Sequence, residues 1–482
     1  MEEIKKAVQA AVKELFNVEV VVELTRPDEQ FGDYATNVAL QLAGQLQKNP
    51  REIADQLVQH VRGRTSHIKD ASVAGPGFIN LHLTDEFLAK QAFEQNLARP
   101  LDGKVVVAEY SDPNPFKILH AGHLYTSVVG DAIASLLEQA GATVHRVNFG
   151  GDVGLHVAKT MWAILGELGG ENPDKLKEIA DELRSEWLAS AYIKGTNAYE
   201  ESEQTKQEIV QLNKRIYQLQ NDNDHDTPFA QIYWTCRQWS YDYFDQFYDS
   251  IGTKFEKYYP ESLTAPLGIK TVEEQLAKGV YERSDGAIIF NGEKYGLHTR
   301  VFINSEGLPT YEAKDVGLIM TKWQDYHFDK SVVITGNEIV EYMKVVLKSI
   351  EQFLPELSNA TVHLTHGMVK LQGGEKMSSR KGNILRAVDV LAAAAAANQK
   401  TSGRSDKDVE LGAVKYSFLK QRLGADIIYD PEESVSIQGN SGPYLQYAHA
   451  RARSILAKSG EAKQLPAYDF EPGERSLVRK LG

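Results

Sequence analysis

A buried strand, a proline-rich turn, a helix and a second strand follow one another within residues 104–149. This succession limits the fold more than any other feature of the sequence. KVVVAEY at 104–110 is a nearly continuous apolar run, as in strands that are buried on both faces. A helical apolar stripe follows, and TVHRVNF at 143–149 is the second strand. The sequence therefore predicts a βαβ unit with a right-handed crossover, and an α/β domain built on a parallel sheet.

The remaining chain divides into further expected domains. The whole chain has 482 residues, which is more than one hydrophobic core usually supports. Residues 1–98 read as a small α+β domain with a first helix and a second helix that starts at Thr36. VEVVVEL at 18–24 and FINLHL at 78–83 are its expected strands.

The α/β domain is expected to span 103–435, with a helical insertion at about 155–255. GAIIF and RVFIN predict paired strands, and SVVIT and TVHLT predict further sheet strands. Residues 436–482 begin an all-α domain. They are too few for an independent helical domain of ordinary size, so we expect this domain to be truncated.

Composition excludes several classes of protein. No stretch approaches the roughly 18 to 20 apolar residues of a membrane span, and the N-terminus is a charged amphipathic helix, so we expect a cytoplasmic protein without membrane contact. Cys236 is the only cysteine, which excludes an internal disulfide and a cysteine-cluster zinc site. The formal charge of −13 argues against nonspecific nucleic-acid binding. Residues 370–386 nevertheless carry five basic side chains and one acidic one.

Two histidines stand at an expected helix start in SDPNPFKILHAGHL, residues 111–124. The prolines keep the chain extended, so the helix begins after them, with His120 and His123 on one face. Free N–H groups and the helix dipole would favour a phosphate there, and Gly122 would let a flat group such as adenine approach. A metal pair and two ordinary surface histidines are the alternatives, and the spacing alone does not decide among the three.

A second candidate is GGEKMSSRKGN at residues 373–383. It carries Lys376, Arg380 and Lys381 beside Ser378, a set of donors suited to a polyphosphate. A solvated basic loop is the alternative. Histidines at a helix start together with this downstream loop form a more specific pair than either motif alone.

HAGH resembles the His-Ile-Gly-His signature, and KMSSR the Lys-Met-Ser-Lys-Ser loop, of class I aminoacyl-tRNA synthetases. SDPNPFKILHAGHL, FGDYATN at 31–37, the Tyr-x-x-x-Asp of Tyr311 and Asp315, and NSGPYLQYAHARARSIL at 440–456 resemble the arginyl-tRNA synthetase family of that class. The resemblance implies a Rossmann-like catalytic domain that forms arginyl-adenylate from L-arginine and ATP. It further implies transfer to the 3′-terminal ribose of tRNA, with release of AMP and pyrophosphate.

The resemblance also implies the residues of the ATP site. His120, His123 and Lys376 would be catalytic. ATP, with Mg²⁺ on its phosphates, would contact His120, Gly122, His123, Lys376, Met377, Ser378, Arg380 and Lys381. No protein metal site is expected. A carboxylate is already nucleophilic, so activation needs in-line positioning and charge neutralisation more than a general base.

Arginine recognition requires carboxylates, because the guanidinium is a planar fork that they match. The resemblance implies an arginine site made of Glu109, Ser111, Asn114, Tyr311, Asp315 and Glu338. Asp315 is the strongest candidate, with Tyr311 on the same face if the segment is helical. Without the resemblance, this pair would be read as an ordinary helix-surface pair.

For tRNA, the resemblance implies a D-loop contact by Asn37, stacking on Phe31, and a basic helix that includes Arg451. A turn with Asn37 at a helix start is the alternative. Arginyl enzymes typically need bound tRNA before activation, and the rest of the helical anticodon-binding domain is absent. We therefore expect impaired charging, and we expect a monomer.

Two positions depart from the family pattern. Ser379 stands where such loops carry a second lysine, which leaves open the cation that replaces it, and Glu338 stands where many relatives carry a glutamine. Two other functions remain as alternatives: a nucleotidylyltransferase or amino-acid ligase on the same core, and a non-catalytic tRNA-binding or amino-acid-sensing paralogue. The tRNA-like elements at both ends argue against the first. Intact His120, His123 and Lys376 argue against the second.

Overall fold

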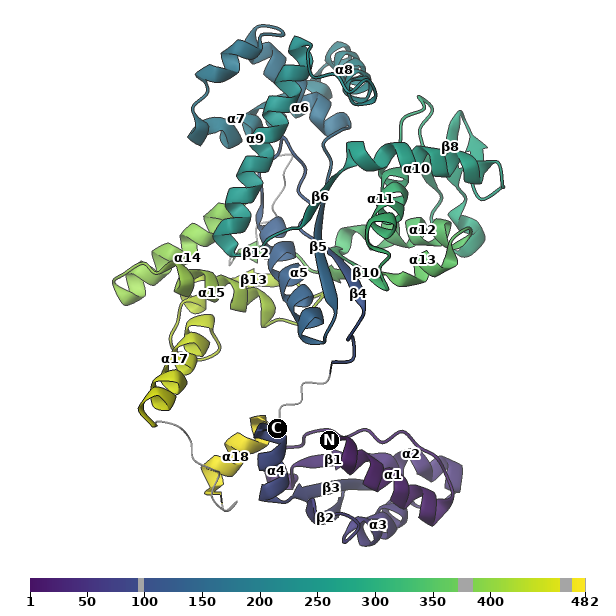
Figure 1. Cartoon of the computed structure of the whole chain (residues 1–482), viewed down its shortest axis with the longest axis vertical. Helices are drawn as coiled ribbons and strands as arrows, with labels where there is room; N and C mark the ends of the chain where they lie inside the picture. The colour runs from purple at the N-terminus through teal and green to yellow at the C-terminus, as the bar shows by residue number, and fades with distance from the viewer. Residues whose placement is uncertain (94–98, 372–384, 460–469, 482) are drawn as a thin grey trace. The chain divides into compact units, whose positions relative to one another are not determined.

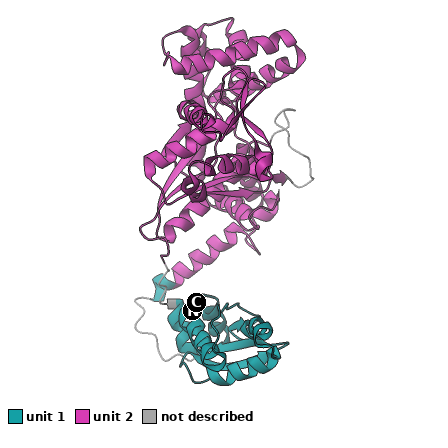
Figure 2. Cartoon of the chain, turned by 90° about the vertical axis from the view of Figure 1, so that its right-hand side faces the viewer, with its two compact units in different colours: residues 1–98, 456–482 teal, residues 99–455 magenta. Residues whose placement is uncertain are grey.

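The computed structural model describes residues 1–93, 99–371, 385–459 and 470–481. Two compact units make up the chain: residues 1–98 with 456–482, and residues 99–455 (Figure 2). Within the described ranges, no helix is both long and apolar enough to cross a bilayer.

The first unit contains a three-stranded antiparallel sheet in the order β1-β3-β2, covered by helices. Its strands are β1 (Tyr34–Thr36), β2 (Ile68–Ala74) and β3 (Phe78–Leu83). Its helices are α1 (Glu2–Phe16), the 3-10 turn η1 (Glu29–Phe31), α2 (Val38–Leu46), α3 (Pro50–Val61), α4 (Asp85–Phe93) and α18 (Pro472–Leu481). The buried faces of α1, α2 and α3 form one apolar core with the sheet.

The predicted strand at 18–24 is wrong. These residues belong to no strand, and only the following residue, Thr25, makes an isolated bridge, to Ala35. Val22 is buried, but the segment lies beside α1, where the side chain of Gln9 donates to the carbonyl of Val20 at 3.3 Å. The alternating apolar residues of 18–24 therefore place one side of this segment against the core, although the segment forms no ladder of backbone hydrogen bonds. The helix expected from Thr36 begins at Val38, because Thr36 ends β1.

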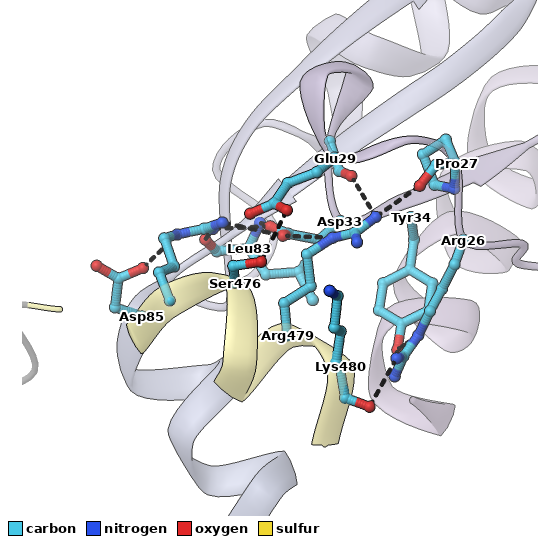
Figure 3. A network of polar contacts seen from close by, with 12 residues as sticks. Arg26, Pro27, Glu29, Asp33, Tyr34, Leu83, Asp85, Ser476, Arg479 and Lys480 are labelled. Carbon is cyan, nitrogen blue, oxygen red and sulfur yellow. Dashed lines mark hydrogen bonds and ion pairs between the residues drawn. The ribbon is translucent and has the colours of Figure 1, made fainter. Parts of the chain in front are cut away.

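Within the first unit, the buried carboxylate of Asp33 holds helix α18 against the rest of the unit (Figure 3). Asp33 is only 1% exposed and accepts from the backbone N–H of Leu83 at 2.7 Å. The guanidinium of Arg475 donates to both Asp33 oxygens, at 3.1 and 2.9 Å, and also pairs with Asp85 at 2.7 Å. Arg479 donates to the carbonyl of Gly32 at 3.0 Å. One buried acid thus ties the turn before β1 to the end of the chain.

The second unit is built on a five-stranded, fully parallel sheet, which confirms the predicted α/β fold (Figure 1). Its order is β11-β10-β4-β5-β6. Its strands are β4 (Val105–Glu109), β5 (Thr143–Gly150), β6 (Lys257–Pro260), β10 (Lys330–Gly336) and β11 (Thr361–His366). Numbered by their succession in the chain, these strands follow the order 3-2-1-4-5 of a doubly wound sheet. The direction of winding therefore reverses between β4 and β10, where such folds bind ligands.

Helices surround this sheet, and the expected insertion is helical. The crossover helix is α5 (Ala121–Gln139). The insertion contains α6 (Leu155–Leu168), the turns η2 (Pro173–Glu178) and η3 (Asp181–Leu183), α7 (Arg184–Glu201), α8 (Glu203–Asn221) and α9 (Pro228–Ile251), which cluster at the top of Figure 1. Cys236 lies buried in their core.

A second group of elements lies between β6 and β11. It contains α10 (Glu261–Leu276), β7 (Glu282–Ser284), β8 (Ala287–Phe290), η4 (Gly292–Tyr295), β9 (Arg300–Ile303), α11 (Tyr311–Tyr326), η5 (Asn337–Ile339), α12 (Val340–Glu351) and α13 (Pro355–Ala360). The predicted pairing of GAIIF with RVFIN is confirmed, since β8 and β9 are antiparallel neighbours.

The unit ends in a helical region with a short parallel pair of strands, β12 and β13. Its elements are β12 (Val369–Leu371), α14 (Ala387–Ser402), α15 (Lys407–Leu419), β13 (Ile427–Tyr429), α16 (Pro431–Ser434) and α17 (Gly442–Ser459). The last of these begins in the predicted segment at 440–456 and is mostly exposed.

Replacing Asp33 should release α18 from the first unit. Asp33→Asn leaves Arg475 and Arg479 without their buried counter-charge, and breaking such a pair costs about 3 kcal/mol. Amides of α18 should then exchange with solvent on the order of 100-fold faster in hydrogen-exchange mass spectrometry of the whole chain. Asp28→Asn is the matched control, because Asp28 lies in the same turn and makes no ion pair within the described ranges. Equal protection of α18 in both variants would contradict this account.

Candidate functional site

A cavity of about 840 Å³ opens at the carboxyl ends of β4 and β10, where the winding of the sheet reverses. Open α/β sheets bind their ligands at this position. The cavity brings together every described residue that the sequence predicted for ATP or for arginine. These are Glu109, Ser111, Asn114, His120, Gly122, His123, Tyr311, Asp315 and Glu338.

The turn between β4 and α5 is held in an unusual backbone conformation. Ser111, Asp112 and Phe116 have φ values of 76°, 47° and 65°, a region that side chains other than glycine seldom adopt. Buried hydrogen bonds hold it there, among them 2.8 Å between the hydroxyls of Ser111 and Tyr248. The backbone N–H of Phe116 donates to Ser240 at 2.9 Å. Such strain persists only where the surroundings enforce it, and it is common at functional sites.

Two side chains of this turn bond to the end of the neighbouring strand. Asp112 accepts from the N–H of Phe149 at 2.9 Å, and Asn114 accepts from the N–H of Gly151 at 2.8 Å. Because the Asn114 oxygen is engaged, its amide NH₂ is the group left for a ligand.

His120 and His123 stack at the start of α5, with ring centroids 3.8 Å apart. His120 is the N-cap, and its Nδ1 accepts from the N–H of Gly122 at 3.1 Å. Nδ1 of His123 accepts from the N–H of His120, also at 3.1 Å. In a neutral imidazole one nitrogen accepts and the other donates, so both rings must carry their proton on Nε2.

Burial keeps both rings neutral. It lowers the pKa of His120 to about 4, with a smaller contribution from the nearby charge of Lys117. Burial likewise lowers the pKa of His123, assisted by His120 and Lys117. At neutral pH the pair therefore offers two neutral Nε2–H donors, not two cations.

The N–H groups at this helix start are already bonded, which differs from the expectation of free donors. Ala121 donates to the carbonyl of Leu385 at 2.8 Å, Gly122 to His120 Nδ1, and His123 to the carbonyl of His120 at 2.9 Å. Phosphate binding at this position would therefore use the imidazoles and the helix dipole.

Gly122 is required by the ring of His120. A Cβ at this position would lie 2.8 Å from two atoms of that ring. The sequence interpretation assigned the small residue to an approaching ligand. The geometry assigns it first to the packing of the capping histidine.

Burial affects carboxylates around the cavity, and two of them have cationic partners. Glu109 forms an ion pair with Lys322, which is fully buried. Glu261 forms an ion pair with Lys314 at 2.6 Å. Asp315 is 8% exposed, and within the described residues its hydrogen bond comes from the hydroxyl of Tyr342, a neutral group. Asp315 thus has no paired cation within the described residues, and neither has Asp112, which accepts from the backbone N–H of Phe149.

This environment favours the neutral form of Asp315. Burial raises its pKa to about 7, and the charges of Glu109 and Glu261 act in the same direction. The hydrogen bond from Tyr342 and the charge of Lys322 oppose that rise. Burial and Glu109 also raise the pKa of Asp112 well above its usual range. A cationic ligand would supply the missing charge.

Tyr311 and Glu338 lie at the mouth of the cavity. Tyr311 begins α11 and is 53% exposed, and the ammonium of Lys314 lies 5.0 Å from its ring centroid. Glu338 is exposed, and its carboxylate lies against Gly336, where a Cβ would be 2.2 Å away. Asp315 follows Tyr311 by one helical turn, as the predicted i, i+4 spacing requires.

Sequence reasoning missed several residues of this cavity. Lys322 could have been found, because it lies seven residues after Asp315 on the same helix face. Asp112 was read only as part of a turn. Tyr342 gives no local signal, because it belongs to α12 and reaches Asp315 through tertiary packing. Within the described residues, no cluster of three or more His, Cys, Asp or Glu is arranged to hold a metal.

The predicted loop residues Lys376, Met377, Ser378, Arg380 and Lys381 lie outside the described residues. The described chain on either side approaches the cavity. Lys370 lines the cavity, and the backbone of Arg386 forms an isolated antiparallel β-bridge with that of His120. Ala387 donates to the carbonyl of Leu119 at 3.0 Å.

The residues predicted for tRNA are not part of this cavity. Phe31 is 49% exposed, and the Asn37 side chain accepts from Gln41 at 2.9 Å, both in the first unit. Arg451 belongs to the second unit, on α17, where its guanidinium lies 5.7 Å from the ring centroid of Tyr447.

Two family models match the chain. The model described as "tRNA synthetases class I (R), catalytic domain" matches residues 84–429. The model described as "Arginyl tRNA synthetase N terminal domain" matches residues 2–83.

Comparison with individual proteins also finds arginine–tRNA ligases. An arginine–tRNA ligase of Amoebophilus asiaticus is 28% identical over 99% of this chain and 86% of its own length. One from Borreliella burgdorferi is 28% identical over 92% and 78%. The structure of Thermus thermophilus arginyl-tRNA synthetase has the same fold, with a TM-score of 0.78 at 24% identity, over 100% of this chain and 85% of the other.

His120 and His123 should remain neutral well below neutral pH. Since burial lowers both pKa values, we expect ¹⁵N spectra of histidine-labelled protein to report the Nε2–H tautomer for His120 and His123 from about pH 8 to about pH 5.5. The same chain unfolded in urea is the control, and its histidines should titrate in their ordinary range. Protonation of either ring near pH 6.5 in the folded chain would contradict this geometry.

Proposed function

This chain belongs to the class I arginyl-tRNA synthetase family, and we propose that its cavity carries out that family's reaction. The resemblance inferred from HAGH and KMSSR is thereby confirmed. The chain is an arginine–tRNA ligase: it activates L-arginine with ATP to arginyl-adenylate and passes the arginyl group to tRNA. The roles of individual residues are our proposals.

One observation supports the arginine site most directly. Of the buried carboxylates at the cavity, Glu109 and Glu261 have lysine partners, whereas Asp315 has only the Tyr342 hydroxyl within the described chain. A guanidinium would restore the balance and match a carboxylate with two parallel hydrogen bonds. We therefore assign Asp315 to the guanidinium, with Tyr311 beside it.

The α-amino group of arginine would lie nearer the strained turn. Glu109, Ser111 and Asn114 line that side of the cavity, and the free amide NH₂ of Asn114 can face the substrate. The ammonium of Lys322 balances the negative charge of Glu109. This carboxylate can therefore accept a hydrogen bond from the α-amino group and is not a further buried acid without a cation, beside Asp315. Glu338, at the mouth, is assigned to the outer part of the amino acid.

ATP would occupy the side of the cavity formed by α5. Neutral Nε2–H groups of His120 and His123 can donate to phosphate oxygens without protonation changes. Lys376, Arg380 and Lys381 would supply the cations, with Met377 and Ser378 beside them. Mg²⁺ enters with the phosphates, because it prefers oxygen ligands and phosphate partners.

Activation joins the two substrates. A carboxylate oxygen of arginine attacks the α-phosphorus of ATP, a new P–O bond forms, and the bond to pyrophosphate breaks. The protein contributes alignment and stabilisation of charge on the phosphate oxygens, so no residue has to remove a proton.

Transfer then requires the tRNA 3′ end in the same cavity. We propose that Phe31 and Asn37 contact the D-loop and that Arg451 contributes to a basic helix for the tRNA. The reaction would take place in the cytoplasm, where charged tRNA is used, by a monomer.

Replacing Asp315 should abolish high-affinity use of arginine. Asp315→Asn keeps the shape but leaves the guanidinium without a counter-charge, so KM for arginine should rise by about 100-fold or more in aminoacylation assays, while KM for ATP changes little. An unchanged arginine KM would remove Asp315 from the site.

The arginine KM should also depend on pH. With its pKa raised to about 7, Asp315 must lose its proton before it pairs with the cation. KM should therefore fall as pH rises through about 7 and should level off above it, with about a tenfold change per unit on the acidic side. Asp315→Asn should remove this dependence, and a profile that survives in that variant would assign it to another group.

The loop at 373–383 should act on kcat. Lys376→Met should lower kcat about 100-fold with little change in arginine KM, because its charge is used as pyrophosphate leaves. Either Arg380 or Lys381 takes the place of the missing second lysine. Of the variants Arg380→Met and Lys381→Met, the one that removes this cation should lower kcat by a comparable factor. Lys400→Met, an exposed change on α14, is the control. Normal kcat in all three loop variants would contradict the proposal.

A further inference from the structure

Tyr342 contacts Asp315, a buried carboxylate of the cavity that has no cationic partner within the described residues. It lies in the first turn of α12, lines the cavity, and donates its hydroxyl hydrogen to Oδ2 of Asp315. Within the described residues, Oδ1 of Asp315 remains available to a ligand. A single fixed donor on one oxygen sets the plane of the carboxylate, and a guanidinium reads that plane through two parallel bonds.

Tyr342 is itself held in place. Its ring packs against the apolar core around α11 and α12. The guanidinium of Arg300 lies 5.4 Å from the ring centroid and pairs with Glu312, on α11, at 3.1 Å. Burial and the charge of Asp315 raise the pKa of the Tyr342 hydroxyl, so the hydroxyl keeps its proton and can only donate to the carboxylate.

We propose that Tyr342 is a specificity-determining positioning residue for the amino acid. Its hydroxyl orients Asp315 and favours the carboxylate anion, so that the cavity accepts the guanidinium cation and discriminates against a neutral group of the same shape. The ureido group of citrulline is such a group. This proposal rests on the arginine site assigned to Asp315 above.

The charges around Asp315 explain why a neutral donor matters. Glu109 on β4 and Glu261 on α10 both favour the protonated acid, and Lys322 on α11 opposes them from within its pair with Glu109. Tyr342 on α12 is the remaining group that favours the anion. Without its hydroxyl, more of Asp315 would carry a proton near neutral pH, and a protonated acid can donate to a urea oxygen.

The test compares matched tyrosine variants in the full chain. Tyr342→Phe removes the hydroxyl at Asp315. Tyr281→Phe removes another buried hydroxyl, which does not line the cavity. That hydroxyl donates at 3.1 Å to Ser349, which lies on α12 as Tyr342 does. Arginine KM, ATP KM, kcat and inhibition by citrulline are measured in aminoacylation assays across the pH range. Asp315→Asn serves as the reference for the site.

For Tyr342→Phe we expect an arginine KM about tenfold higher near neutral pH, as for loss of one hydrogen bond to a charged group. The pH at which this KM levels off should move up by about one unit, with ATP KM and saturating kcat within about twofold. Arginine should also lose preference over citrulline, and recover it at higher pH. Tyr281→Phe should change none of these quantities.

The outcomes separate this inference from the function it rests on. If Asp315→Asn weakens arginine binding but Tyr342→Phe keeps the wild-type pH profile and citrulline discrimination, the role of Tyr342 is overturned and the arginine site stands. If Tyr281→Phe shifts the profile equally, the effect belongs to α12 packing and the inference also fails. If Asp315→Asn itself leaves arginine use unchanged, the site assignment is wrong, and the inference fails with it.

Discussion

The site depends on one constraint, the parallel pairing of β4 with a strand on each side. Val105–Glu109 runs in register with β5 on one edge and with β10 on the other. All three strands therefore end at the same edge of the sheet, and the chain leaving β4 must turn where the winding reverses. The strained turn at 111–116 and the helix capped by His120 both follow from this position.

We propose that charge balance gives the resulting cavity its selectivity. A protein does not leave a buried carboxylate ionised without compensation, and two of the acids here meet that condition with lysines from α11. Asp315 does so only in part, through a hydroxyl. Incomplete compensation costs stability in the free protein and is recovered when a cation binds. The same account makes the histidines neutral donors, because burial keeps them uncharged beside the nearby Lys117.

Local patterns predicted the elements but not their long-range partners. The βαβ unit, the helix start at His120 and the one-turn spacing of Tyr311 and Asp315 depend on residues close in the sequence, and the structure contains them. Apolar alternation at 18–24 misled the prediction, because a strand also needs a partner ladder. The bond from Tyr342 to Asp315 and the bond from the Ala121 N–H to the carbonyl of Leu385 arise from packing across the chain, which no local pattern encodes. The roles of Lys376 and of Ser379 remain predictions from the motif.

The most direct test is amino-acid-dependent exchange between ATP and pyrophosphate by the whole chain, measured with and without arginine tRNA. The account predicts exchange that requires L-arginine in the presence of tRNA, is not supported by lysine or citrulline, and disappears in Asp315→Asn. Exchange that proceeds equally with other amino acids, or that persists in Asp315→Asn at low arginine, would contradict it.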